Sequence, residues 1–164
     1  MRRRTLFIAV ALLTFVIGAA AATLWYLHRP IFSRAVDEDS IAEAVFRQSI
    51  KDEEQNAESS AIYCLSRDKN TDPSDELMRR FADYSNRVRK LSQCEKTGYG
   101  VTDKQTGKRG MSLEIQRLTW VSRNEAKVAI LHYSWGMGQT GFGCNVIREH
   151  GSWMVKNCEW GLIT

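Results

Sequence analysis

The chain of 164 residues is long enough for one domain of ordinary size but not for two catalytic domains. Its 23 basic and 19 acidic residues give a net charge of +4, most of it from Arg2, Arg3 and Arg4, so the remainder lacks the basic surface of a nucleic-acid-binding protein. The 43% content of apolar residues and the presence of only two prolines exclude a disordered or fibrous chain.

The first predicted element is a membrane anchor. No charged side chain occurs from Leu6 to Leu27, and a helix of that length spans roughly 33 Å, enough to cross the hydrocarbon core of a bilayer. The arginines before this segment outnumber those just after it. By the positive-inside rule, residues 1–5 form a basic cytoplasmic tail, residues 6–27 form a transmembrane signal anchor, and the rest of the chain lies outside the cytoplasm.

A cleaved signal peptide is the alternative interpretation, because Leu6–Val16 is apolar and the small residues of Gly18–Ala22 offer cleavage sites. We favour the retained anchor, since cleavage there would leave the apolar Leu24–Leu27 at a new N-terminus. Both interpretations export the remainder. The expected location is a bacterial inner membrane, with a single pass and the C-terminal domain in the periplasm, or secretion if the segment is cleaved.

A polar tether over residues 28–39 is expected to lead into an exported domain over residues 40–164. Ser40 and Glu43 have the spacing of a capping box, and apolar residues then recur at helical spacing, which predicts a helix from about 40 to 57. The apolar residues 61–65 predict a buried strand. The run Asp-Pro-Ser-Asp-Glu at 72–76 predicts the start of a second helix, which ends near residue 84.

From residue 88 onward, apolar and polar side chains alternate with the period of a β-strand. Strands are expected in the alternating segments 111–116 and 126–130, and also at about 88–94, 98–103, 142–149 and 152–161. The pairs Thr106-Gly107 and His150-Gly151 predict tight turns. The predicted fold class is therefore α+β, in which helices pack on a curled antiparallel sheet.

Four phrases support a resemblance: Asp-Pro-Ser-Asp-Glu-Leu at 72–77, Asp-Lys-Gln-Thr-Gly-Lys-Arg-Gly at 103–110, Trp-Val-Ser at 120–122, and Arg-Glu-His-Gly-Ser-Trp-Met-Val at 148–155. With the order of elements, they resemble an uncharacterised bacterial family of membrane-anchored or exported proteins. The resemblance implies the cystatin-like, or nuclear transport factor two-like, α+β cone. It brings no known catalytic residues, and the cone superfamily includes both enzymes and membrane-anchored assembly subunits.

Four cysteines follow the predicted anchor, and none forms a Cys-x-x-Cys pair. An even number of cysteines in an exported domain favours disulfides over a zinc site or a redox motif. Cys144 and Cys158 flank the predicted turn at His150-Gly151, which places them nearly opposite each other on two arms of a hairpin. We therefore predict a Cys144–Cys158 disulfide and, by elimination, a Cys64–Cys94 disulfide; four buried thiols are the alternative.

Charge is distributed unevenly along the chain. Acidic residues outnumber basic ones between residues 36 and 78, and basic residues dominate between 79 and 123. A basic cluster could contact an acidic partner or anionic lipid, and it consists of Arg79, Arg80, Arg87, Arg89 and Lys90. The alternative is that this cluster neutralises the acidic first helix within the fold.

Residues 136–141 are rich in glycine, with Gly136, Gly138 and Gly141 at the spacing Gly-x-Gly-x-x-Gly. A dinucleotide site needs a helix after these glycines, whereas a strand is expected here, so the glycines indicate a loop. Three apolar residues beside it are predicted to form a lip that contacts a partner or ligand: Trp135, Met137 and Phe142.

One histidine, His132, is expected to face the interior from a strand, because it shares its parity with Val128 and Ile130. It is either a hydrogen-bonded core residue or a general base assisted by Tyr63 or Asp83. The sequence contains no pattern typical of a metal site, a phosphate-binding loop or a catalytic triad, so no metal and no cofactor are expected.

These observations predict a membrane-anchored extracytoplasmic binding or assembly module without catalytic activity, which has a protein partner and binds no nucleic acid. The alternative is a small-molecule-binding or isomerase-like or cyclase-like enzyme of the cone fold that uses His132. The surroundings of His132 distinguish the two. A carboxylate and an open cavity favour the alternative, whereas a tightly filled apolar interior favours the module.

Overall fold

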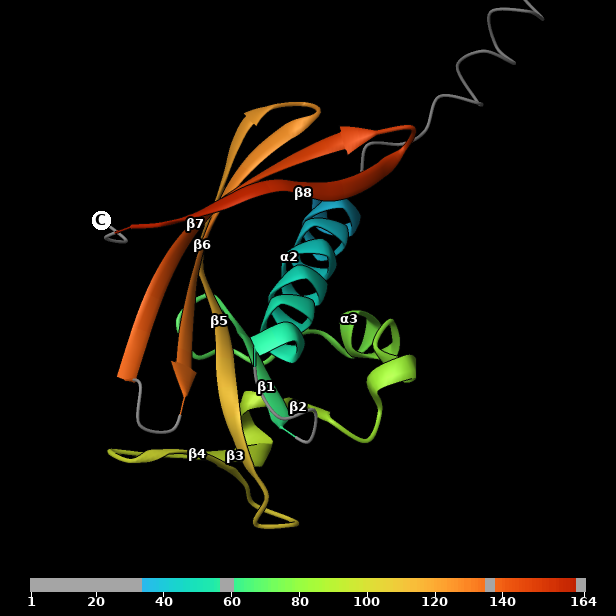
Figure 1. The fold of residues 1–164 in the computed structure, drawn as a ribbon. Helices are drawn as coiled ribbons and strands as arrows, with labels where there is room; N and C mark the ends of the chain where they lie inside the picture. Colours follow the sequence, from blue (N-terminus) through green and yellow to red (C-terminus); the bar gives the residue numbers. More distant parts are fainter. Residues whose placement is uncertain (1–33, 57–60, 135–137, 162–164) are drawn as a thin grey trace, which may run out of the picture. The chain divides into compact units, whose positions relative to one another are not determined.

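The computed structural model describes residues 34–56, 61–134 and 138–161 (Figure 1). These residues contain two α-helices and one eight-stranded sheet. The helices are α2 (Arg34–Asn56) and the short α3 (Asp75–Arg79). The strands are β1 (Ile62–Arg67), β2 (Val88–Lys90), β3 (Cys94–Thr97), β4 (Gly100–Asp103), β5 (Arg109–Ser122), β6 (Glu125–Ser134), β7 (Gly138–Glu149) and β8 (Ser152–Trp160).

Helix α2 lies along one face of the sheet (Figure 1). Its buried stripe includes Ile41, Val45, Phe46 and Ile50, which pack in the main hydrophobic core. The helix begins at Arg34, six residues earlier than predicted and inside the expected tether. The reason is that Ser40 does not cap a helix end. Its hydroxyl donates to the carbonyl oxygen of Val36 at 2.9 Å, a bond within the helix.

The predicted antiparallel sheet was wrong, because the sheet is mixed. Six of its strands follow the order β2-β1-β5-β6-β7-β8, and the β3–β4 hairpin joins the sheet where β4 pairs with β5. Strand β1 runs parallel to both β2 and β5. A long connection between β1 and β5 makes this pairing possible, since parallel strands need a crossover of a dozen or more residues. The predicted fold class, with helices packed on a curled antiparallel sheet, is therefore corrected to a large mixed sheet with one long and one short α-helix.

Strand β1 is buried on both faces. Tyr63 and Leu65 belong to the core under α2, whereas Ile62 and Cys64 belong to a second apolar cluster. Because successive side chains of a strand point to opposite faces, this second cluster lies on the face of β1 away from α2. It is completed by Leu91, Cys94 and Val101, with Tyr133 packed against it.

The sequence predicted both disulfides correctly. Cys64 of β1 is bonded to Cys94 at the start of β3, which fastens the β3–β4 hairpin to the second cluster. Cys144 of β7 and Cys158 of β8 are directly paired across the hairpin and form the other disulfide. The turn of this hairpin is at His150-Gly151, where both residues have a positive φ.

No helix in the described ranges is both long and apolar enough to cross a membrane. The predicted anchor over residues 6–27 lies outside the residues that the structure describes, as do the cytoplasmic tail over residues 1–5 and the first part of the tether.

Candidate functional site

His132 lies on the inner face of the sheet, where it contacts α2. In β6 the side chains of Val128, Ile130 and His132 alternate with more exposed residues, and only 8% of His132 is exposed. Its Nε2 atom lies 3.2 Å from the hydroxyl oxygen of Ser49, and its Nδ1 atom lies 3.3 Å from Oε1 of Glu53. Both ring nitrogens therefore have polar partners on the helix.

Helical periodicity places these two partners together. Ser49 and Glu53 are four residues apart, so they project from the same side of α2, one turn after the other. This side continues the buried stripe that contains Val45 and Phe46. Two polar residues thus occupy the last turns of this side of the helix, and His132 lies opposite them.

A cavity of about 280 Å³ opens beside this contact. Its lining combines side chains of α2 with the inner face of three strands: Ser49, Asp52, Glu53, Ile130, His132, Phe142, Cys144, Cys158 and Trp160. The Cys144–Cys158 disulfide therefore forms part of the wall. The surroundings of His132 include both a carboxylate and an open cavity.

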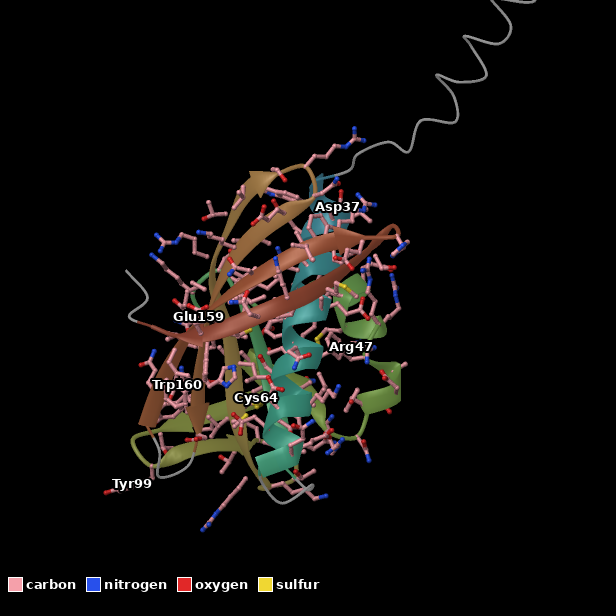
Figure 2. The ribbon with its side chains drawn as sticks, turned by 45° about the horizontal axis from the view of Figure 1, so that its top comes forward. Asp37, Arg47, Cys64, Tyr99, Glu159 and Trp160 are labelled. Atoms are coloured by element: carbon pink, nitrogen blue, oxygen red, sulfur yellow. A yellow bond between two sulfur atoms is a disulfide. The ribbon has the colours of Figure 1, made fainter. Side chains whose placement is uncertain are left out.

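Three rings form a row along the cavity. The His132 and Phe142 ring centroids are 4.6 Å apart, and those of Phe142 and Trp160 are 5.0 Å apart. The first ring of the row is buried, whereas 79% of Trp160 is exposed. Figure 2 shows Trp160 near the end of β8. The row therefore leads from the interior to the solvent.

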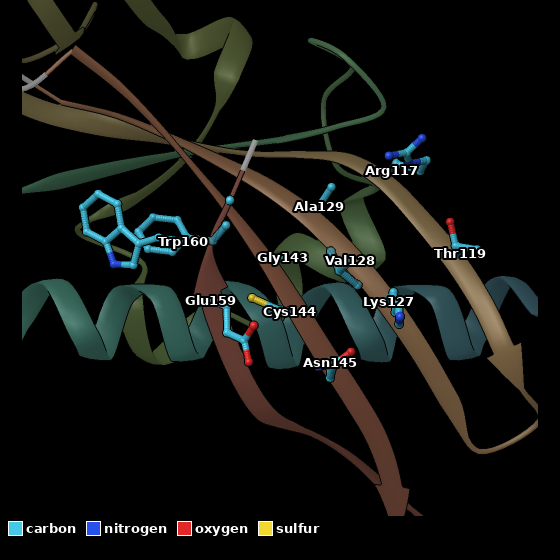
Figure 3. Close-up of a pocket in the computed structure, with 12 residues that line it drawn as sticks. Arg117, Thr119, Lys127, Val128, Ala129, Gly143, Cys144, Asn145, Glu159 and Trp160 are labelled. Carbon is cyan, nitrogen blue, oxygen red and sulfur yellow. The ribbon is translucent and has the colours of Figure 1, made fainter. Parts of the chain in front are cut away.

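A second hollow, of about 420 Å³, lies on the outer face of the sheet (Figure 3). Ala129 and Gly143, which has no side chain, are cross-strand partners in its lining. Phe142, Cys144 and Trp160 line both this hollow and the His132 cavity. Lys127 and Arg117 border the hollow on one side and Glu159 on another. Its exposed charges have both signs and it is more open than the His132 cavity, so we regard the His132 cavity as the candidate site.

The contacts of His132 have the residue types of a serine, histidine and carboxylate triad. A nucleophilic serine also needs hydrogen-bond donors for the oxyanion that forms during acyl transfer. Ser49 lies inside a helix that runs from Arg34 to Asn56, where backbone N–H groups already donate to carbonyl oxygens four residues earlier. Within the described helix, Ser49 thus lacks the neighbouring free backbone donors that support a serine nucleophile.

The two residues predicted to assist His132 have other partners. Asp83 accepts hydrogen bonds from Arg47, the shorter at 2.7 Å, and this pairing lowers the pKa of its carboxyl group. Tyr63 is buried in the main core with the Arg87 guanidinium over its ring. Burial is the main cause of the raised pKa of the Tyr63 phenol. The predicted constellation of His132, Tyr63 and Asp83 is not formed.

The predicted basic cluster is paired within the domain. Two of its members, Arg80 and Arg87, form ion pairs with Glu43 and Glu54 of α2. The other pairs are Arg79 with Glu76, Arg89 with Asp103, and Lys90 with Asp75. Two of the five pairs therefore neutralise acidic residues of the first helix, as the alternative predicts, whereas the other three balance acidic residues elsewhere in the domain.

Of the predicted apolar lip, Phe142 lies in the wall of the cavity. Trp135 and Met137 lie outside the described residues. Sequence reasoning did not identify Ser49, Glu53 or Trp160 as site residues. The sequence did indicate the first two, because Ser49 and Glu53 are polar residues at positions where the helical periodicity predicts buried side chains.

In the described part of the chain, no group of three histidine, cysteine or acidic side chains is placed to hold a metal ion. Comparisons with protein-family models, with curated proteins and with solved structures found no match. The geometry of the site therefore carries the functional argument.

Proposed function

We propose that this domain binds a small molecule in the cavity between α2 and the β6–β8 end of the sheet. The observation that carries the proposal is the contact of His132 with Ser49 and Glu53 beside an open cavity. Binding sites for small molecules combine apolar walls with a few convergent polar groups. The aromatic row supplies the apolar wall, and the three polar side chains supply the convergent groups.

Binding is better supported than catalysis. Both nitrogens of His132 already contact the protein, so the ring would have to exchange a partner before it could take a proton from a substrate. Ser49 lacks the helix-end or loop setting in which neighbouring N–H groups stabilise an oxyanion. The contact instead fixes the orientation of the polar groups that a ligand meets.

We also propose that the domain functions outside the cytoplasm, held at a bacterial inner membrane by residues 6–27. Two disulfides support this location, because disulfides persist in oxidising compartments and are rare in the cytosol. The apolar, uncharged segment 6–27 supports the anchor. Retention of the protein in carbonate-washed membranes tests the anchor, and recovery of a shortened soluble form would contradict it.

The binding function is tested by screening a library of small, soluble fragments against the full-length protein in dodecyl maltoside, with ligand-observed NMR as the measurement. We expect fragments whose signals depend on Trp160. The variant Trp160→Ala removes an exposed wall of the cavity, so it should abolish binding without loss of folding.

The matched control is Tyr99→Ala. Tyr99 is an equally exposed aromatic residue, with 78% exposure, in the turn between β3 and β4 (Figure 2). This control should keep the binding of every fragment that Trp160→Ala loses. A screen without hits, or hits that bind equally to Trp160→Ala, would refute the proposed function.

A further inference from the structure

We infer that the ligand of this cavity is a small organic cation, such as an amine or a quaternary ammonium compound. This inference rests on the proposed function and specifies its ligand class. It depends on the charges, the aromatic walls and the size of the cavity, which are independent features.

The charged residues of the lining are acidic. Asp52 and Glu53 line the cavity, and the described lining includes no lysine or arginine. Glu53 uses Oε1 in its contact with His132, and a carboxylate offers about four lone-pair positions, so it can accept further bonds. A cation that enters the cavity is attracted by these carboxylates, whereas an anion is repelled by them.

The aromatic side chains add a second attraction for the same class of ligand. The face of an aromatic ring carries partial negative charge and binds cations, and tryptophan does so best. Trp160 and Phe142 pack edge to face, with their planes at 60°. The faces of the two rings therefore point in different directions. Aromatic rings arranged in this way can surround a compact cationic group.

The exposure of Trp160 supports a binding role for its ring. A tryptophan is highly buried on average, yet 79% of this residue is exposed at the entrance of the cavity. A cavity of about 280 Å³ is also at the small end of the range for ligand sites. The ligand is therefore smaller than a typical drug molecule.

Three probes whose branched heads have the same shape, but which differ in charge, test the inference. They are choline, which is cationic, 3,3-dimethylbutan-1-ol, which is its neutral analogue, and 3,3-dimethylbutanoate, which is anionic. Each is titrated at constant ionic strength into the full-length protein in dodecyl maltoside. The measurement is the shift of the Trp160 indole N–H signal in ¹H–¹⁵N NMR spectra, identified among five tryptophans with Trp160→Phe.

We expect choline to bind at least tenfold more tightly than the neutral alcohol, and the anion to cause no shift. The variant Asp52→Asn removes one charge at a position that is exposed and so preserves the fold. It should weaken choline binding about fivefold or more and leave binding of the alcohol unchanged. The matched control is Glu149→Gln, which removes an exposed charge at the end of β7 and should alter neither.

Two results would overturn the inference while leaving the proposed function intact: equal binding of the alcohol and choline, or tighter binding of the anion. Unchanged choline binding by Asp52→Asn would also overturn it. If none of the three probes binds, the cation inference fails, and the fragment screen with Trp160→Ala separately decides whether the cavity binds any small molecule.

Discussion

Gly110 of β5 faces Ile62 of β1 so closely that a methyl group at Gly110 would lie 2.1 Å from the carbonyl oxygen of Ile62. The methyl group would meet a backbone atom, and the two residues are directly paired in parallel strands. Neither strand can therefore move away without breaking the pairing. Glycine is required here because of this close approach.

We therefore predict that Gly110→Ala destabilises the domain by more than about 2 kcal/mol, because β1 and β5 must separate to admit the methyl group. Gly143→Ala is the control, since its methyl group would meet no atom within 4 Å in the middle of β7. Chemical denaturation of the full-length protein in detergent measures both. Equal stability of the two variants would contradict the prediction.

Arg47 connects α2 to the segment after α3. Its guanidinium donates to Asp83 at 2.7 Å, to Glu43 at 2.9 Å and to the carbonyl oxygen of Arg80 at 2.6 Å. It also lies over the ring of Phe81. The hydrogen bond that Arg47 donates to Asp83 is the largest of several contacts that raise the pKa of the guanidinium.

We predict that Arg47→Met destabilises the protein by about 1–3 kcal/mol, because it leaves two part-buried acceptors, Glu43 and the Arg80 carbonyl oxygen, without their charged donor. Arg79→Met is the matched control, since Arg79 is 72% exposed and pairs only with a neighbour on its own helix in the described contacts. Its thermal unfolding should resemble that of the wild type. A similar loss in both variants would show that Arg47 acts only as a surface charge.

Asp103 gives the stability a defined pH dependence. Its carboxylate accepts bonds from the Gln105 N–H at 2.9 Å and the Thr106 hydroxyl at 2.9 Å, and the first of these is the main cause of its lowered pKa. Because the folded-state pKa lies below the unfolded value of about 3.9, the stabilisation is present above pH 5 and disappears as the pH falls through the folded pKa.

The asparagine of Asp103→Asn carries no charge at any pH, so the variant lacks the stabilisation that the ionised carboxylate provides. We expect it to be less stable than the wild type at pH 7 and to match the wild type more closely near pH 2, where the aspartate is also uncharged. Melting temperatures measured between pH 2 and 7 test the expectation. Asp68→Asn, in the exposed turn after β1, should show no such convergence. A difference for Asp103→Asn that stays constant with pH would contradict it.

The Ser49, His132 and Glu53 contact leads to a prediction about reactivity. Since the helix interior around Ser49 offers no backbone donors for an oxyanion, we expect no covalent labelling of Ser49 by a fluorophosphonate. Mass spectrometry of the treated protein is the measurement, with a known serine hydrolase as the positive control. A stoichiometric adduct on Ser49 that is lost in His132→Asn would establish a nucleophile and refute the preference for binding.

Local patterns predicted much of the C-terminal half. The turn at His150-Gly151 and the positions of Cys144 and Cys158 defined a hairpin, and the structure confirms both the hairpin and its disulfide. Such predictions succeed because the residues that determine a hairpin are close together in the sequence. The Cys64–Cys94 disulfide was also correct, although it was reached by elimination.

Local sequence patterns could not predict whether β1 is parallel or antiparallel to its neighbours. An apolar run such as residues 62–65 indicates a buried strand, but the same run suits a parallel or an antiparallel position. Its partners are in β5, and the first pair, Ile62 with Gly110, is separated by 48 positions in the sequence. The tertiary structure, and not the local pattern, determines this pairing.

The partners of His132 were missed for a similar reason. Parity placed His132 on the inner face, but the element opposite depends on where α2 crosses the sheet. The sequence favours Asp83 as a helper of His132, but in the fold the Asp83 carboxylate accepts a hydrogen bond from Arg47 instead. The helix also began earlier than predicted, because Ser40 bonds to Val36 within the helix instead of capping its end.

The two disulfides join consecutive cysteines, Cys64 with Cys94 and Cys144 with Cys158. A chain is synthesised from its N-terminus. The native partner of Cys64 is therefore the next cysteine to emerge, and the same is true of Cys144. An oxidase that acts on the chain in that order forms the native bonds directly. Oxidative folding of this domain is therefore expected to proceed without the slow reshuffling that a disulfide isomerase catalyses.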